Sequence, residues 1–262
     1  MDIALLNQNY YELSKTYDLD DPNILRKFIH GLTTADGCFS IANSLNLSKD
    51  EREFIYACGL LHDIGRMEQW KTYKSFSDSI TRPHETLGVE ILKGEWIKKF
   101  FETIEKQELA LKLIQHHTSI YYGQGKDLKR FLSILRNADN YANLQYTASG
   151  LQRLWVTKDG VTPDVLQKFQ KRKNLHGVPI YTKLDRILQF LSRTYAIDYP
   201  MLKKDLLGRK YINAIYDVYS ENLNKADKSL LYKECWSLKK ELAEEVLKYE
   251  KRKKLAIQKG NA

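Results

Sequence analysis

The stretch Gly59-Leu60-Leu61-His62-Asp63-Ile64-Gly65-Arg66 joins a histidine directly to an aspartate at the end of an apolar segment. The residues before it have helical spacing, and Ser48 and Glu51 form a capping-box pattern at the start of that helix. Neighbouring residues on a helix point about 100° apart, so adjacent ligands can share one ion only beyond the helix end. We expect Gly65 to end the helix there. The stretch therefore predicts a pair of ligands at a helix terminus.

The chain on either side of this stretch also has helical periodicity. Asp21-Pro22 is typical of a helix start, and the helix that it opens carries His30. Residues 71–83 are polar and irregular, and we expect a surface loop of the kind that covers a site. Further helices are predicted over residues 84–92, 96–117 (in one or two pieces) and 128–144, from Thr162-Pro163 onward, and over the C-terminal segment. No run alternates long enough to require a sheet, so the predicted fold class is all-α.

The domain organisation follows from a change of character after residue 150. We expect residues 1–150 to form the helical core that holds the site. Residues 151–262 are predicted to be a helical extension packed on the same domain, ending in a long basic helix. Between residues 155 and 179 the chain is rich in loop-forming residues, which favours a loop-rich insertion or a substrate-side subdomain rather than a second folding unit.

Composition limits the classes of function. Hydrophobic residues make up 43% and charged residues 29%, as in globular proteins that are not embedded in a membrane. Charges interrupt every apolar run, and the three cysteines are scattered without CxxC spacing, which favours a cytoplasmic protein without a leader or membrane segment. Lysine and arginine exceed the acids by 42 − 33 = 9, so we expect an anionic partner. Such a charge attracts a nucleotide, a nucleic acid or a phosphate ester. A small phosphorylated substrate, above all a nucleotide, is the expected partner and nucleic acid the weaker one, because much of the basic excess lies in the C-terminal segment, where we expect it to keep a helix solvated.

Two residues outside the opening stretch complete a candidate metal site. His30 lies in the middle of the preceding helix, and Asp139 lies in a later one, in Ile134-Leu135-Arg136-Asn137-Ala138-Asp139. A charged aspartate on an apolar helical face is unfavourable unless it is paired or binds a metal. Two imidazoles and two carboxylates from separate helices suit a divalent metal such as Mn, Fe, Ni, Co, Zn or Mg.

This order of residues (a histidine, a His-Asp pair and a distant aspartate) resembles the HD superfamily of metal-dependent phosphohydrolases. Residues 60–69, 84–92 and 134–139 are similar to stand-alone bacterial HD proteins of similar length, and the likeness extends weakly to about residue 215. The resemblance implies an HD-domain helical bundle with additional C-terminal helices. It also implies a first metal ion held by four residues: His30, His62, Asp63 and Asp139.

In binuclear members of that superfamily, the resemblance implies that Asp63 would bridge two ions. His84, together with His117 or His116, would complete the second site. The adjacent histidines 116 and 117 resemble the paired histidines of such members. The sequence therefore leaves open whether the site holds one metal ion or two.

The chain departs from known relatives in ways that concern the substrate. The Gly-Tyr-Pro signature of cyclic-dinucleotide phosphodiesterases is absent, since residues 118–123 read Thr-Ser-Ile-Tyr-Tyr-Gly. Related proteins often carry an acid where this chain has Asn137. We expect the substrate phosphate to be held by arginines near the motifs, and Tyr121 and Tyr122 are weaker candidates for stacking on a base. The arginine candidates are Arg66, Arg136 and Arg82.

The leading hypothesis is hydrolysis of a phosphate ester or anhydride by a phosphomonoesterase or phosphodiesterase. Asp63 or a nearby carboxylate would orient the attacking water, and Arg66, with the metal, would offset charge on the phosphorus oxygens. Two alternatives are a di-iron oxygenase of the HD type and a non-catalytic, metal-containing module that binds nucleotides or nucleic acid. No P-loop or Rossmann glycine pattern is present, which argues against ATP-driven or NAD-dependent chemistry.

Overall fold

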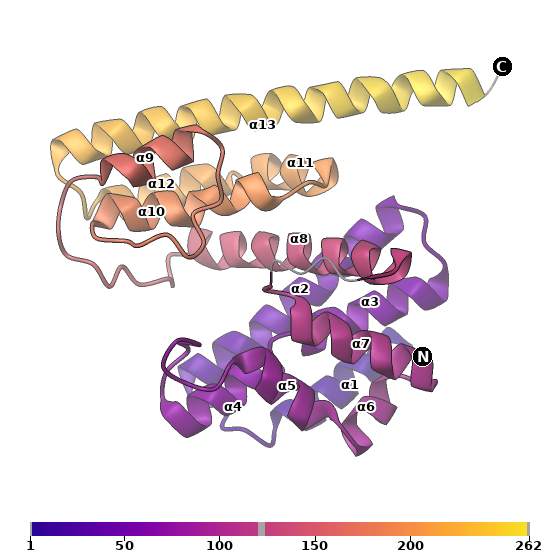
Figure 1. Cartoon of the computed structure of the whole chain (residues 1–262). Coiled ribbons are helices and arrows are strands. Elements are labelled where there is room, and N and C mark those ends of the chain that lie inside the picture. Colours follow the sequence, from indigo (N-terminus) through magenta and orange to yellow (C-terminus); the bar gives the residue numbers. More distant parts are fainter. Residues whose placement is uncertain (1, 120–123, 261–262) are drawn as a thin grey trace. The chain divides into compact units, whose positions relative to one another are not determined.

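The computed structural model describes residues 2–119 and 124–260, with side chains described up to residue 255. It divides the chain into two compact units, Met1–Ala142 and Asn143–Ala262. The described residues contain helices and no strand, which confirms the predicted all-α class (Figure 1). The helices of the first unit are α1 (Ile3–Ser14), α2 (Pro22–Ser44), α3 (Lys49–Leu61), α4 (Ile64–Tyr73), α5 (His84–Leu92), α6 (Glu95–Phe100), α7 (Ile104–His116) and most of α8 (Lys126–Ala148).

The predicted starts of two helices are confirmed by their caps. The Asp21 side chain accepts a hydrogen bond from the Asn23 amide, and a proline occupies the first turn of α2. At α3, Ser48 and Glu51 form both halves of a capping box. The segment predicted over residues 96–117 forms two helices, α6 and α7. Local side-chain chemistry therefore sets where these helices begin.

The prediction that Gly65 ends a helix is wrong. Helix α3 ends at Leu61, and Gly65 lies in the first turn of α4. It is glycine because of packing: a Cβ atom there would lie 1.9 Å from the carbonyl oxygen of His84. The absence of a side chain lets α4 contact the start of α5 backbone to backbone.

The predicted loop over residues 71–83 is shorter than expected. Helix α4 continues to Tyr73 and stops at Lys74, whose left-handed backbone has φ 51°. The loop therefore covers residues 74–83, and it leads directly into α5.

Close packing of α2 on α3 brings the first two histidines together. A Cβ atom at Gly59 would lie 2.6 Å from the Ala35 Cα, so the two helices approach at backbone contact. Buried apolar side chains fill the space around this crossing. They include Ile24, Cys38, Ile41, Ile55, Cys58, Leu60 and Leu61. His30 on α2 and His62 at the end of α3 consequently have ring centroids 5.1 Å apart.

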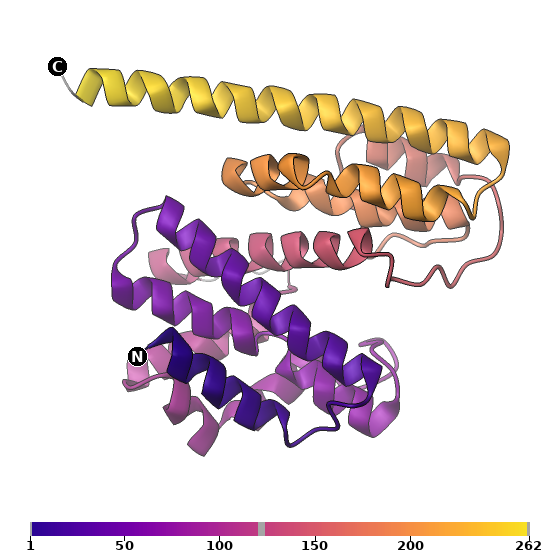
Figure 2. The ribbon, with the colours of Figure 1, turned by 180° about the vertical axis from the view of Figure 1, so that it is seen from behind.

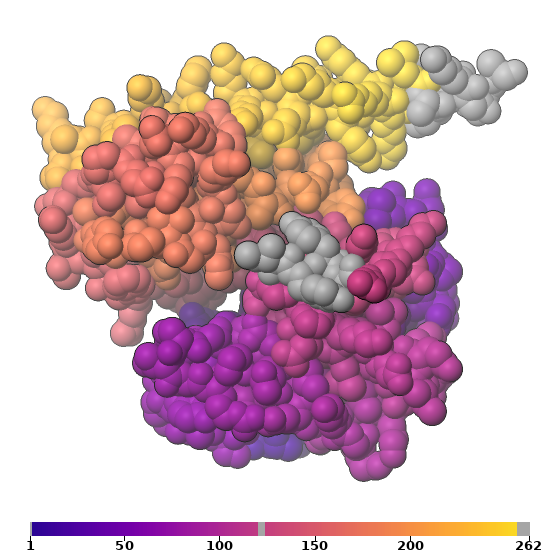
Figure 3. Space-filling model, in the orientation of Figure 1, coloured from indigo at the N-terminus to yellow at the C-terminus, as the bar shows by residue number. Residues whose placement is uncertain are grey.

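The second unit is helical as well. After the end of α8 it contains α9 (Pro163–Gln170), α10 (Lys183–Ser192), the 3₁₀ turn η1 (Arg193–Ala196), α11 (Pro200–Gly208), α12 (Tyr211–Ser220) and α13 (Lys225–Gly260). Helix α13 lies along α11 and α12 (Figure 2). It buries Leu231, Cys235, Leu238 and Leu242, whereas its other side lies at the surface, as the yellow band of Figure 3 shows. The predicted packing of residues 151–262 on the same domain as the core stays a prediction.

Two further features concern the whole of the described chain. All three cysteines are buried free thiols. Among the described residues, no helix combines the length and the apolar character needed to cross a bilayer.

Candidate metal centre

Four of the predicted ligands meet inside the first unit. His30 comes from the middle of α2, His62 follows the last residue of α3, Asp63 precedes α4, and Asp139 lies in α8. The His30 Nε2 atom is 3.0 Å from Asp139 Oδ1 and 3.6 Å from Asp63 Oδ2. The His62 Nε2 atom is 3.7 Å and 3.8 Å from the same two oxygens. We call these four side chains the first group.

A second group lies on the other side of Asp63. The His84 Nε2 atom is 3.3 Å from Asp63 Oδ1, and the His117 Nε2 atom is 3.6 Å from that oxygen. The two Nε2 atoms are 3.3 Å from each other. Helix α5 supplies the first of these histidines as its first residue, and the second follows α7 directly.

Asp63 is the residue common to both groups. Its Oδ2 faces the first group and its Oδ1 faces the second. Although Asp63 occupies the N-cap position of α4, its side chain makes no capping hydrogen bond. The carboxylate is thus directed to the cluster rather than to the helix start, with each oxygen near a different pair of imidazoles.

The imidazole rings are oriented by their Nδ1 atoms. The His62 Nδ1 atom is 2.8 Å from the Gly59 carbonyl oxygen, and the His117 Nδ1 atom is 2.8 Å from that of Ile114. Because a carbonyl oxygen only accepts, the ring hydrogen must lie on Nδ1 in both histidines. The lone pair of a neutral ring then lies on Nε2, directed into the cluster. This is the tautomer that a metal-binding histidine requires.

The donor atoms fit a bound divalent metal. The Nε2 atoms of His30 and His62 are buried, and neither has a hydrogen-bonding partner of good geometry within the described residues. The Nε2 atoms of His84 and His117 face each other. Buried lone pairs that face one another and a carboxylate are unfavourable unless a cation lies among them. Two sets of three close donor atoms could each hold such a cation. One set is His30, His62 and Asp63, and the other is Asp63, His84 and His117.

The charges in the cluster favour ionised carboxylates. Burial raises the pKa of Asp63, but the neighbouring Lys27 and, where it carries a proton in place of a metal, His62 outweigh it and hold that pKa well below its usual value. Burial likewise opposes ionisation of Asp139, whereas protonated rings of His30 and His62 lower its pKa by more. Both aspartates therefore carry full negative charge at neutral pH and provide the anionic part of a metal site.

Lys27 was missed by the sequence reasoning. Its Nζ donates a hydrogen bond of 2.7 Å to Asp63 Oδ2, and its side chain is 14% exposed. Burial lowers the pKa of Lys27, opposed by the charge of Asp63. The available signal was its position three residues before His30, which places both on one face of α2. Lys27 thus provides a mostly buried cation beside the carboxylate shared by both groups.

Arg66 lies at the edge of the cluster and contacts the loop over residues 74–83. Its Nε atom is 3.9 Å from Asp63 Oδ1. Its Nη1 and Nη2 atoms bind the Asp78 carboxylate at 3.0 and 2.9 Å, and Nη1 also donates to the Phe76 carbonyl oxygen. The guanidinium therefore holds the loop in this structure, and its role with a substrate stays a prediction.

The other predicted substrate residues contact backbone oxygens or a surface carboxylate. Arg136 donates to the carbonyl oxygens of His116, His117 and Ser119 and so binds the chain at the end of α7. Arg82 pairs with Glu90 at the surface. The structure brings the ring of His117 into the cluster; the metal-compatible groups among the described residues do not include His116. Tyr121 and Tyr122 lie outside the described residues.

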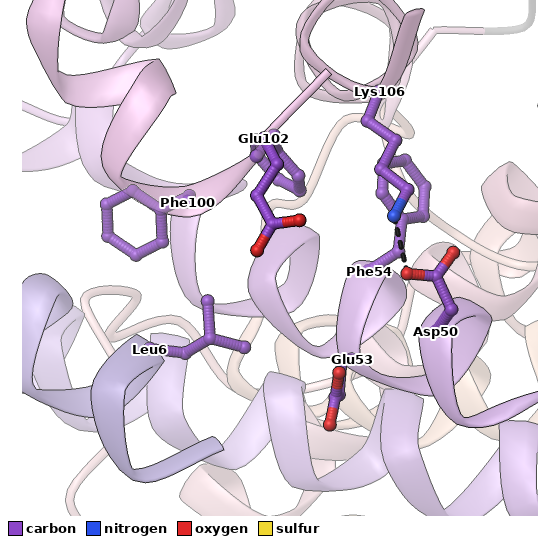
Figure 4. Close-up of a pocket in the computed structure, with 8 residues that line it drawn as sticks. Leu6, Asp50, Glu53, Phe54, Phe100, Glu102 and Lys106 are labelled. Atoms are coloured by element: carbon purple, nitrogen blue, oxygen red, sulfur yellow. Dashed lines mark hydrogen bonds and ion pairs between the residues drawn. The ribbon is translucent and has the colours of Figure 1, made fainter. Parts of the chain in front are cut away.

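A surface hollow elsewhere in the first unit is separate from the cluster (Figure 4). Leu6, Phe54, Phe100 and Phe101 contribute its apolar lining. At its rim, Lys106 donates to Asp50 at 2.5 Å. None of the cluster residues lines this hollow.

Comparison with known proteins gives one match. The sequence model of a family described as the HD domain matches residues 28–144. That span contains both groups of candidate ligands. No curated protein and no solved structure matches the chain.

Proposed function

Because the chain belongs to the HD-domain superfamily through residues 28–144, we propose that it is a metal-dependent phosphohydrolase. Its substrate would be a phosphate ester or anhydride of a nucleotide or a related phosphorylated small molecule. The observation that carries the proposal is the carboxylate of Asp63, whose two oxygens each face a buried pair of imidazole Nε2 atoms.

The candidate ligands form two sets, one for each of two metal ions. His30, His62, Asp63 and Asp139 would hold the first ion. Asp63, His84 and His117 would hold the second, with Asp63 bridging. A divalent metal bound there lowers the pKa of a coordinated water toward about 7 and polarises phosphoryl oxygens.

The chain itself would bind the phosphate and orient the attacking water. Lys27 has one of its three ammonium hydrogens engaged with Asp63, which leaves donors for a non-bridging phosphate oxygen. Its mostly buried cation would stabilise negative charge developing on that oxygen more strongly than a fully exposed one, because less water screens it. Asp63, ionised and next to both groups, would accept a hydrogen bond from the attacking water.

The nitrogen-rich second group also supports a second candidate function. The donor set of imidazoles and carboxylates suits two irons as well as Mn or Zn, so a di-iron oxygenase remains the alternative enzyme. Iron at two ions per chain, with an electronic spectrum that changes on exposure to dioxygen, would favour that alternative.

The test is metal content and turnover in matched variants. Protein purified without chelator is analysed by plasma mass spectrometry and then assayed on a panel of phosphate esters and nucleotides. We expect one or two transition-metal ions per wild-type chain and almost none in Asp63→Ala. Lys27→Met leaves every candidate ligand in place, so it should keep the metal and lose about 10²- to 10³-fold in turnover.

Two results would contradict the proposal. Equal metal content in the wild type and Asp63→Ala would remove the site. A metal-loaded wild type that hydrolyses no phosphate compound of the panel would remove the phosphohydrolase function and leave a metal-containing binding module.

A further inference from the structure

The loop over residues 74–83 is organised around one carboxylate, that of Asp78. Arg66 binds both of its oxygens, at 3.0 and 2.9 Å. Gln69 Nε2 donates to Oδ1 at 2.9 Å, and the backbone amide of His84 donates to the same atom at 3.1 Å. Asp78 therefore connects two side chains of α4 to the first residue of α5.

Gln69 of α4 also holds this loop through hydrogen bonds. It is fully buried, and its Nε2 also donates to Thr81 Oγ1 and to the Arg82 carbonyl oxygen. The Asp78 side chain is 37% exposed, yet these contacts all point inward to α4 and α5. The loop thus has a defined position against the metal centre.

The Asp78 carboxylate also contacts a candidate ligand directly. The His84 Nδ1 atom is 3.0 and 3.1 Å from the two Asp78 oxygens and 3.1 Å from Glu85 Oε2. Carboxylates of this kind accept hydrogen bonds, so the ring hydrogen lies on Nδ1 and the Nε2 lone pair faces Asp63 and His117. Asp78 is thus placed to fix both the tautomer and the direction of the ring.

The position of His84 in the helix explains why a loop carboxylate is needed. His62 and His117 each use a carbonyl oxygen three residues earlier in their own helices. His84 is the first residue of α5, so no preceding turn of that helix exists to offer a carbonyl oxygen. The Asp78 carboxylate takes this role with two oxygens at 3.0 and 3.1 Å, next to one oxygen of Glu85, and its charge at the start of a helix is also favourable.

Asp78, His84 and Glu85 could in principle bind a cation themselves, since they offer three close donor atoms. That arrangement would use Nδ1 of His84, and a neutral imidazole cannot offer lone pairs on both nitrogens. Arg66 already supplies a positive charge to Asp78. An accepting role for Asp78 therefore agrees better with the contacts than a ligand role.

We propose that Asp78 is a positioning residue that makes occupancy of the second metal position depend on the loop over residues 74–83. It holds His84 with Nε2 directed at Asp63, whereas the hydrogen bonds and ion pairs of Asp78 within the described residues are made with Arg66, Gln69 and His84, none of which belongs to the first group. This inference rests on the proposed function, because it requires that both positions bind metal.

The test is a titration of metal-free protein with Mn²⁺, followed by calorimetry and by electron paramagnetic resonance of free Mn²⁺. The wild type should bind two ions. In Asp78→Asn the first ion should bind as in the wild type, and the second should bind about 10- to 100-fold more weakly. Asp78→Glu, which keeps an accepting carboxylate, should recover part of the loss.

A matched control removes a carboxylate of α5 that pairs with the loop at Arg82 and is not one of the cluster residues. Glu90→Gln breaks the exposed pair with Arg82 and should leave both binding steps unchanged. Asp139→Asn should show the opposite pattern to Asp78→Asn and weaken the first ion.

The outcomes separate this inference from the proposed function. Two ions bound with wild-type affinity by Asp78→Asn would overturn the positioning role and leave the proposed function intact. Equal weakening of both ions in Asp78→Asn would also overturn it, because Asp78 would then support the fold as a whole. A wild type that binds no Mn²⁺, Fe²⁺ or Zn²⁺ would contradict the proposed function and this inference with it.

Discussion

Asp63 is the only residue between the C-cap of α3, at His62, and the first residue of α4. One helix ends just before Asp63 and the next begins just after it. Both oxygens of its carboxylate can therefore contact other side chains. Each oxygen then meets imidazoles from different parts of the first unit. The same position explains why the adjacent His62 can face the first group while its Nδ1 bonds to its own helix.

Gly65 provides a prediction at the residue scale. In Gly65→Ala the new methyl group would meet the carbonyl oxygen of His84 and the amide nitrogen of Gly88, so α5 must shift away from α4. We expect the free energy of unfolding to fall by about 1–3 kcal/mol, and the ion that depends on His84 to bind more weakly. Urea unfolding and Mn²⁺ titration measure the two effects.

Gly208→Ala is the control for this substitution, because a Cβ atom there has no neighbour within 4 Å and its φ is not left-handed. It should be neutral or stabilise the fold by up to about 1 kcal/mol. A Gly65→Ala protein as stable as Gly208→Ala, with unchanged metal binding, would contradict the close packing of α4 on α5.

At the scale of elements, helix caps and hydrogen bonds between neighbouring helices hold the helix ends in place in both units. Arg136 binds carbonyl oxygens at the end of α7, including that of His117, and so holds this candidate ligand from a different helix. In the second unit, Asp185 and Thr182 form a capping box at the start of α10. The buried Asp185 carboxylate also accepts from the amide and the hydroxyl of Thr162, just before α9.

Asp185→Ala is predicted to destabilise the second unit strongly. It would leave the amides of Thr162, Tyr181 and Thr182 without their acceptor and remove the capping box of α10. An unsatisfied polar group is unfavourable by about 1–3 kcal/mol where it is buried, as it is at Thr182. We expect a loss of about 3 kcal/mol or more in the free energy of unfolding, measured by urea denaturation followed by circular dichroism.

The comparison for Asp185 is Asp164→Asn, which removes an exposed carboxylate paired with Lys168 one turn away. It should change the free energy of unfolding by about 0.5 kcal/mol. Similar losses in the two variants would show that the buried carboxylate does not join α9 and α10.

At the scale of the whole molecule, the candidate ligands come from α2, the α3–α4 junction, α5, the end of α7 and α8. All of them lie in the first unit, Met1–Ala142. A bound ion would therefore connect nearly every long helix of that unit, and it would bind the folded chain but not the unfolded one.

Metal should consequently raise the melting temperature of the protein. At a free metal concentration of 100 times Kd, binding stabilises the folded state by about 2.7 kcal/mol, which corresponds to roughly 5–10 °C for a chain of this size. Differential scanning calorimetry with Mn²⁺, then with excess chelator, measures the shift. The same shift in Asp63→Ala would show that the ion acts elsewhere.

The sequence by itself determined the all-α class, the caps at Asp21 and Ser48 and the residues that form the first group. Each depends on local chemistry or on a recognisable motif: a cap is read within four residues, and His62-Asp63 is adjacent in the chain. The family resemblance supplied the more distant His30 and Asp139. In each case the signal is present in the order of residues along the chain.

Only the tertiary structure decided the parts that depend on distant segments. Gly65 is read locally as a helix stop, and its true role is set by the His84 backbone, with which it packs. Lys27 and Asp78 carry no motif, and their contacts with Asp63 and His84 exist only after α2, α4 and α5 have packed. The physical reason is that hydrogen bonds and burial depend on separation in space, which the sequence records only for near neighbours.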